Sequence, residues 1–331
     1  MIPLKIAGNG IYTPQQTMPS SQLDEIFGHE KGWTENKFGI RQRGVAAAHE
    51  TSSYMGEQAA RTALAKAGWE AAELDVIIGA CGVMEQPIPS TSVLIQQKLG
   101  IGKSGVPAFD INLTCLSFLS ALDIVAMGMA CGRWKKALIV SSDIASAGID
   151  YAVPETASIF GDGAAAICVE AATEADGKGV VSQHFESYGD YNNLATLRAG
   201  GTKLRVSEGY DALLKGSHFE MDSFGIFKAA AKSLPALIDR VLGKAGKCRD
   251  SIDLIICHQA SRPGVEHIRR LFKSRPERVV NIFADFGNQI ATSLPTALSY
   301  ALDNGLVKAG SHVLLLGTAA GISAGAMVIK L

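Results

Sequence analysis

Two halves of the 331-residue chain repeat one another, and this repeat limits the fold more than any other feature of the sequence. The segment KAGWEAAELDVII begins at Lys66, and KAGKCRDSIDLII begins 178 residues later, at Lys244. Further on, ALIVSS at 137–142 corresponds to VLLLGT at 313–318, with an offset of 176 residues. Because two separate matches share nearly one offset, we predict a duplicated unit of about 170 residues. Chance similarity between two helix–strand patterns is the alternative explanation.

Each half is predicted to alternate helices with short buried strands. An amphipathic helix over 57–67 ends at Gly68, and residues 75–78 then form a continuously apolar strand. The second half repeats this order with a helix over 226–245 and a strand over 254–256. Helices that separate buried strands favour parallel-rich sheets between helical layers. Two such halves packed together predict a duplicated five-layer α/β/α/β/α fold.

The duplication divides the chain into a first half over 1–172 and a second half over 173–331. Residues 186–217 interrupt the pattern of the second half, because they are rich in Gly, Tyr and Asn and carry a charged segment. We expect them to form a long inserted loop that acts as a lid or an entrance wall.

Composition narrows the class of protein. A hydrophobic fraction of 47% and a charged fraction of 19% are typical of a compact core, and no apolar run is long enough to cross a bilayer. The net charge of −1 gives no indication of nucleic acid or membrane binding. The first residues, MIPLKIAGNG, lack a basic region followed by a long apolar stretch, so we expect a cytoplasmic protein. The six cysteines form no C-x-x-C pair and no Cys/His cluster with zinc spacing, so we expect no metal site.

One cysteine lies in a setting that favours chemistry. The segment AFDINLTCLSFLSAL at 108–122 runs from a short strand into a helix that is apolar on nearly every face, so the helix is predicted to be buried. Cys115 lies at or near the start of that helix, where the helix dipole and free N–H groups are expected to lower the thiol pKa. A small, inert buried cysteine is the alternative.

Two polar residues of the second half are candidate partners. His258 follows the strand at 254–257, and ligands of α/β folds bind beyond the carboxyl ends of strands. Asn288 lies in the turn DFGNQIATSLP, which starts a helix at the place that corresponds to Cys115 in the first half. A histidine hydrogen-bonded at a strand end and an asparagine that serves the turn alone are the alternatives. Pseudo-twofold packing is expected to bring the two helix starts together.

Seven further motifs accompany these residues. They are KFGIRQR (37–43), ETSSYMG (50–56), FGDGAAA (160–166), FKAA (227–230), HQA, FGN and GTAAGISAGA (317–326). With them the chain resembles β-ketoacyl-acyl-carrier-protein synthase III, a branch of the thiolase-like condensing enzymes, over essentially its full length. The resemblance implies a triad of Cys115, His258 and Asn288 and no metal or redox cofactor.

The resemblance also implies the reaction. The Cys115 thiolate takes an acyl group from a coenzyme A or phosphopantetheine thioester, and the backbone N–H groups of Cys115 and of the Ala320–Gly321 turn hold the oxyanion. His258 and Asn288 then donate hydrogen bonds to the thioester carbonyl of a malonyl unit. Loss of carbon dioxide gives an enolate that attacks the acyl group, in fatty acid or secondary-metabolite biosynthesis.

Other residues match positions of the same family. The resemblance implies substrate contacts, docking of an acyl carrier protein and a homodimer in which Ile88 reaches the acyl pocket of the partner subunit. It places substrate contacts at Trp33, Lys37, Ile88, Phe227 and Arg262, and carrier-protein docking at Lys228, Arg269 and Arg270. A solvated helix face is the alternative for the basic residues. Ile88 is smaller than phenylalanine, so we hypothesise medium or long acyl donors.

Several alternatives stay open. A specialised acyltransferase and a non-decarboxylative condensing enzyme would have the same fold. A cysteine hydrolase also uses Cys, His and Asn in this chain order, but the C-G-[SA]-C-[WY] setting is missing and the duplication argues against it. An inactive homologue is disfavoured by the complete set of three residues.

Overall fold

The computed structural model describes all residues from 1 to 331, and its main sheet reflects the repeat. Nine strands follow one another in the order β11-β12-β13-β8-β1-β7-β6-β4-β5. The first half supplies β1 (Ile2–Tyr12), β4 (Val76–Gly79), β5 (Ala108–Asp110), β6 (Lys136–Asp143) and β7 (Gly163–Ala171). The second half supplies β8 (Gly179–Ser187), β11 (Leu254–Cys257), β12 (His312–Ala319) and β13 (Ser323–Lys330).

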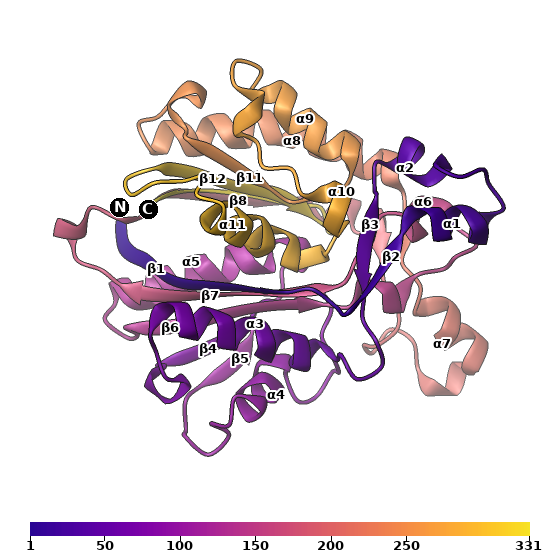
Figure 1. Cartoon of the computed structure of the whole chain (residues 1–331), viewed down its shortest axis with the longest axis horizontal. Coiled ribbons are helices and arrows are strands. Elements are labelled where there is room, and N and C mark those ends of the chain that lie inside the picture. The colour runs from indigo at the N-terminus through magenta and orange to yellow at the C-terminus, as the bar shows by residue number, and fades with distance from the viewer.

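The two halves of this sheet form separate layers. Only two residue pairs, Ile2 with Val180 and Pro3 with Gly179, join β1 to β8. Figure 1 shows the two sheet halves stacked, with helices α5 (Ser117–Ala130) and α11 (Ser293–Asp303) between them. Helices α3 (Ser52–Ala67) and α4 (Thr91–Lys98) cover the outer face of the first half, and α8 (Ser223–Lys244) and α9 (Arg262–Leu271) cover that of the second. The five predicted layers are present.

Pairing within the layers differs from the predicted parallel-rich sheets. Strand β4 is parallel to β5 and β6, and β11 is parallel to β12. The longest ladders, β1–β7, β6–β7, β12–β13 and β13–β8, are antiparallel. The short apolar runs within 75–78 and at 254–256 are thus buried and parallel to their neighbours, as predicted, whereas the longer strands pair antiparallel. A strand covered on both faces is continuously apolar in either orientation, so the sequence did not distinguish the two directions.

The repeat persists in the elements themselves. Strands β6 and β12 have eight residues each, and helices α5 and α11 begin at Ser117 and Ser293, all with the offset of 176 residues. Helix α3 starts five residues before the predicted 57–67, because the Thr51 side chain caps it by accepting from the N–H of Tyr54. Helix α8 also begins before the predicted 226, after Asp222, which caps it in the same way through Gly225.

Residues 186–217 are not the plain loop that the sequence predicted. They contain β9 (Ala195–Thr196), which pairs with β10 (Glu220–Met221), and a helix α7 (Tyr210–Gly216) at one end of the molecule (Figure 1). Smaller elements lie near this end. They are β2 (Gln16–Pro19), α1 (Ser20–Phe27), α2 (Trp33–Phe38), β3 (Gln42–Val45), α6 (Pro154–Ala157) and α10 (Phe283–Phe286).

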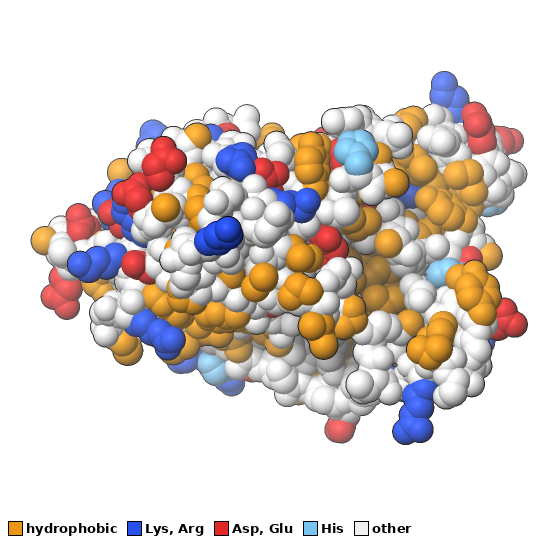
Figure 2. All heavy atoms as spheres, turned by 90° about the horizontal axis from the view of Figure 1, so that it is seen from below, with side chains coloured by type: hydrophobic (Ala, Val, Ile, Leu, Met, Phe, Trp, Pro, Cys, Tyr) orange, Lys and Arg blue, Asp and Glu red, His pale blue; other side chains and the backbone are white.

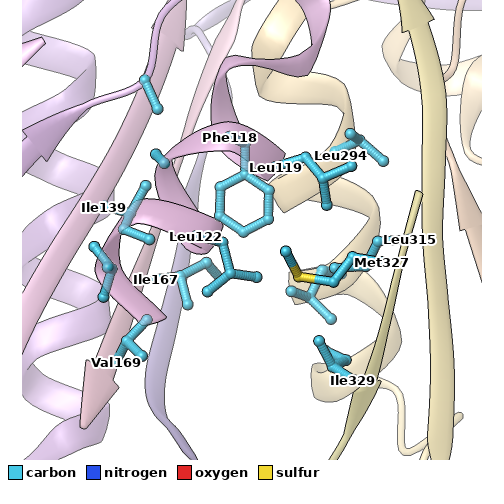
Figure 3. Close-up of a cluster of buried hydrophobic side chains, with 14 of the residues drawn as sticks. Phe118, Leu119, Leu122, Ile139, Ile167, Val169, Leu294, Leu315, Met327 and Ile329 are labelled. Atoms are coloured by element: carbon cyan, nitrogen blue, oxygen red, sulfur yellow. The ribbon is translucent and has the colours of Figure 1, made fainter. Parts of the chain in front are cut away.

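The core of the molecule lies in the middle layer. Its cluster of 31 buried apolar residues joins α5 and α11 to the inner faces of both sheet halves. Figure 3 shows Phe118, Leu119 and Leu122 of α5 among side chains from both halves, including Leu294 and Met327. Such burial supplies most of the free energy that holds the halves together.

We expect the Phe118→Ala variant to lower the free energy of unfolding by about 3–5 kcal/mol, because Phe118 is fully buried and its removal leaves a cavity in the core. Chemical denaturation of both proteins measures this difference. Met127→Ala on the same helix is the control, since that side chain is 46% exposed and its loss should change little. Equal effects of the two substitutions would contradict this account of the middle layer.

Candidate active site

Cys115 lies in a tight turn that the sequence fixes locally. It belongs to a 3₁₀ turn, Thr114–Leu116, that leads directly into α5. Thr114 has a φ of +46°, and its N–H donates to the Asn112 side-chain oxygen at 2.8 Å. The N–H of Leu113 donates to the Ser117 hydroxyl at 2.9 Å. Two side chains therefore hold the turn in an uncommon left-handed conformation that places Cys115 at the helix start.

The turn around Asn288 is built in the same way. Ile290 has a φ of +51°, and its N–H donates to the Asn288 side-chain oxygen at 2.9 Å. The N–H of Gln289 donates to the Ser293 hydroxyl at 3.0 Å. With the offset of 176, Asn288 is the counterpart of Asn112, and Ala291 that of Cys115. A left-handed conformation is costly for a β-branched residue, so its presence indicates that the surrounding hydrogen bonds impose it.

His258 follows strand β11, and its N–H donates to the carbonyl of Leu316 on β12 at 2.9 Å. The ring is buried, and Nδ1 has no hydrogen-bond partner. Burial lowers the pKa of His258 to about 4, so the ring is neutral at neutral pH. The Asn288 side-chain amide donates to the Ala260 carbonyl at 3.3 Å, which brings Asn288 next to the His258 loop.

The charge state of Cys115 differs from the prediction. Burial, with a smaller contribution from the Asp143 carboxylate, raises the pKa of the Cys115 thiol to about 12. The backbone N–H groups of Ala320 and Cys115 act in the opposite direction but do not outweigh burial. The predicted lowering of this pKa by the helix start was therefore wrong, because desolvation of the thiolate exceeds the effect of the nearby N–H groups.

The three candidate residues line one cavity of about 690 Å³. One wall is formed by α8 and α9, through Phe227, Ala230, Leu234, Gly264 and Ile268. Another part of the wall is formed by residues 82–87, by Ala147 and Gly148, and by residues 195–197 and 199–201 of the insertion. Figure 2 shows hydrophobic side chains around a hollow at the end of the molecule that carries α7. The cavity is therefore a mainly apolar chamber that reaches the thiol.

Of the other predicted site residues, Phe227 and Ala320 line this cavity and Gly321 does not. Trp33 lies outside it, with the His29 ring stacked on the indole at a centroid distance of 3.8 Å. Lys37 also lies outside, 4.6 Å from the Trp33 ring centroid and 3.3 Å from the Glu155 carboxylate. The Trp33 ring is thus already in contact with side chains of this chain.

The remaining predicted residues lie further from the cavity. Arg262 donates to the carbonyls of Asn36 and Lys37 at 2.9 and 3.0 Å and so fastens α9 to α2. Arg269 is paired with Glu266 at 3.0 Å, whereas Lys228 and Arg270 are exposed. Ile88 is 86% exposed and does not line the cavity of its own chain.

The sequence did not single out four residues that lie at or beside this site. Asn112, Glu85 and His267 line the cavity, and Asp143 is fully buried beside it. The offset of 176 residues could have found Asn112, because it aligns Asn112 with Asn288. Nothing in the local pattern of SSD at 141–143 distinguishes Asp143 from a strand-end aspartate.

Two structural absences concern cofactors and membranes. No group of three or more His, Cys, Asp or Glu side chains is placed to hold a metal ion. None of the helices combines the length and hydropathy that a bilayer-spanning helix needs.

The layered fold and a cysteine at the start of a buried central helix define a thiolase-like condensing enzyme. The family 3-oxoacyl-[acyl-carrier-protein] synthase III matches residues 109–189, and its C-terminal counterpart matches 242–331. A β-ketoacyl-[acyl-carrier-protein] synthase III of Neisseria meningitidis serogroup C is 33% identical over 327 residues, 98% of each chain. The chain belongs to the β-ketoacyl-acyl-carrier-protein synthase III family.

Solved structures agree with this assignment. The synthase III from Aquifex aeolicus VF5 is 30% identical, with a TM-score of 0.89 over 99% of this chain and 100% of that one. The synthase III from Pseudomonas aeruginosa PAO1 is 27% identical, with a TM-score of 0.90 over 99% and 98%. The likeness extends over both halves of the chain.

Proposed function

We propose that this chain forms a β-ketoacyl thioester by decarboxylative Claisen condensation, with Cys115 as nucleophile and with His258 and Asn288 as its partners. The observation that carries the proposal is the meeting of these three side chains, from both halves, in one apolar cavity. A cysteine with an adjacent neutral imidazole and an amide can carry out both half-reactions without a metal.

In the first half-reaction, Cys115 takes the acyl group of a donor thioester. Since burial raises the pKa of the resting thiol, its proton has to leave during acylation, and we propose that neutral His258, which lines the same cavity, accepts it. The new S–C bond forms as the donor's S–C bond breaks, and His258 returns the proton to the departing thiolate. The backbone N–H groups of Cys115 and Ala320 lower the pKa of the thiol, which supports the proposal that they also stabilise the oxyanion.

In the second half-reaction, a malonyl thioester replaces the departed thiol. The N–H of neutral His258 and the Asn288 amide donate hydrogen bonds to its thioester carbonyl, and the bond to the carboxylate breaks with release of carbon dioxide. The resulting enolate carbon attacks the acyl carbonyl, the bond to Cys115 breaks, and the thiol is regenerated. A dry cavity favours this step, since hydrogen bonds to a developing enolate are stronger there than in water.

The His258→Ala variant should lose condensation, and its acylation should become strongly pH-dependent. Without a base, acylation depends on the small thiolate fraction, which grows about tenfold per pH unit below the thiol pKa. Intact-protein mass spectrometry of acyl–Cys115 between pH 7 and 10, beside an assay of released carbon dioxide, measures the two steps. Cys115→Ala is the control that abolishes labelling. Fast acylation of His258→Ala at pH 7 would contradict the role of His258 as base.

We also propose a medium or long acyl donor. The wall formed by residues 82–87, 147–148 and 195–201 has several small residues, so a chain attached to Cys115 has apolar space beyond the thioester. Phe219 stacks on Phe160 at a centroid distance of 4.8 Å, and Gly148 leaves room for Phe219, since a Cβ there would lie 2.8 Å from its ring.

Ala147→Phe should shorten the preferred donor, because the new ring would occupy the acyl side of the cavity. Acylation rates for straight-chain thioesters of increasing length should fall for the long donors and stay unchanged for the shortest. Ala152→Phe is the matched control, since Ala152 is exposed and lies outside the cavity. A wild-type enzyme that accepts acetyl alone would refute the proposal of a longer donor.

We propose that an acyl carrier protein carries the malonyl unit. The acyl donor is proposed to be attached to coenzyme A or to a carrier protein. Exposed Lys228 and Arg270 support docking of an acidic carrier, whereas Arg269 contributes less because Glu266 neutralises it. The name of the similar Neisseria enzyme refers to an acyl carrier protein. A cytoplasmic location stays a prediction.

We propose a homodimer joined at the free edge of β5. That strand ends the sheet order, and an unpaired edge favours pairing with a second chain. Phe109 on β5 is 37% exposed, and Ile88 and Met84 add exposed apolar area. This arrangement would leave Ile88 free to enter the partner's cavity, as the family resemblance implies.

Phe109→Glu should shift the protein towards monomers, because a charge at the paired edge would be desolvated. Light scattering coupled to size-exclusion chromatography measures the mass. Phe224→Glu is the control, since Phe224 is 77% exposed on α8, away from β5. An unchanged mass for Phe109→Glu would place the interface elsewhere.

The alternatives give different products in one assay with acyl and malonyl thioesters. A hydrolase would release free acid without a β-ketoacyl product, and a non-decarboxylative enzyme would condense without releasing carbon dioxide from malonyl units. An acyltransferase would move the acyl group to another acceptor, and an inactive homologue would leave Cys115 unlabelled.

A further inference from the structure

Asp143, the last residue of β6, is fully buried between the two halves of the chain. One carboxylate oxygen accepts from the backbone N–H groups of Gly82 and Val83 at 2.8 and 2.9 Å. The other accepts from the backbone N–H and the hydroxyl of Thr292 at 3.1 and 3.0 Å. A single side chain therefore joins a cavity-lining loop of the first half to the turn that follows Asn288.

The loop at Gly82 and the turn at Ile290 also pack closely against each other. A Cβ at Gly82 would lie 2.2 Å from the Ile290 side chain, so only glycine allows the loop to approach the left-handed Ile290. Ile290 in turn donates its N–H to the Asn288 side chain. Asp143 thus fixes the loop at Gly82–Val83 and the turn at Thr292 relative to each other, and it accepts two hydrogen bonds from each.

The pseudo-symmetric position shows that the fold does not need this polar contact. At the offset of 176, the counterparts of Asp143 and Thr292 are Ala319 and Leu116. Both are buried members of the central apolar cluster. The same packing is therefore achieved elsewhere in this chain with apolar residues, which avoid the cost of burying a carboxylate.

Nor does Asp143 assist the nucleophile. Its negative charge raises the pKa of Cys115 and of Cys81. A carboxylate beside the thiol opposes thiolate formation, so its contribution to the reaction has to come through the groups that it holds in place.

We propose that Asp143 is a positioning residue for the carbon–carbon bond-forming step. By holding residues 82–83 and the Asn288 turn in one arrangement, it sets the distance between the Asn288 amide and the acyl group on Cys115. The proposal rests on the proposed condensation. Asp143 is assigned a role in the second half-reaction and not in the first. Acylation uses Cys115, His258 and N–H groups to which Asp143 makes no hydrogen bond.

Asp143→Asn tests the proposal. The amide has the same shape as the carboxylate, but its NH₂ group would face a backbone N–H group on one side, where two donors cannot form a hydrogen bond. Condensation should fall by about 100-fold, the cost of a misplaced catalytic group, while acylation of Cys115 persists. Alkylation of Cys115 by iodoacetamide, followed against pH, should shift to lower pH because a nearby negative charge is gone. Thr292→Val should give a smaller loss of condensation, and Thr292→Ser should resemble the wild type.

Ser141→Ala is the matched control. Ser141 is buried on the same strand and donates to the Ala80 carbonyl of its own half at 2.8 Å, so its hydrogen bond does not join the two halves. It should lower the melting temperature without separating the two half-reactions. Parallel loss of both half-reactions in Asp143→Asn, or full condensation, would overturn the proposal. A wild-type enzyme that acylates but does not condense would refute the proposed function instead, and the alkylation shift would still report on Asp143.

Discussion

Burial of α5 and α11 in the middle layer is the constraint on which the site depends. Both helices are apolar on almost every side, so each must be enclosed by two sheets, and neither half of the chain can enclose its own helix alone. The two helices are therefore packed together, and their first turns meet inside the molecule. The cysteine at one of those turns becomes reachable only through a cavity between the halves.

Enclosure also determines the chemistry of the resting site. A dry environment disfavours every charged form, and so the pKa of Cys115 is raised to about 12 while that of His258 is lowered to about 4. The two shifts together keep the pair as a neutral thiol and a neutral imidazole. This state suits both half-reactions, because a neutral imidazole can accept the thiol proton in the first and donate a hydrogen bond in the second.

Sequence reasoning gave the layered architecture, because repeats and apolar runs report burial directly. It also selected Cys115, His258 and Asn288, which the structure brings to one cavity. It failed where the outcome depends on groups distant in sequence. The pKa of Cys115 is set by desolvation and by Asp143, and the directions of the longer strands are set by how the chain connects them. None of these effects has a local signal.

The repeat explains why the chain has one candidate active site although both halves contain the same kind of turn. Asn112 and Asn288 donate to the carbonyls of Gly82 and Ala260, both at 3.3 Å, and both hold a left-handed residue two positions on.

The halves differ in what this common frame carries. Cys115 corresponds to Ala291, and the strand end that bears His258 in the second half bears Ala80 in the first. The proposed nucleophile of one half thus shares its cavity with the proposed base and amide of the other. In this proposal the packing between the halves, which Asp143 joins through hydrogen bonds to Gly82, Val83 and Thr292, is part of the catalytic geometry.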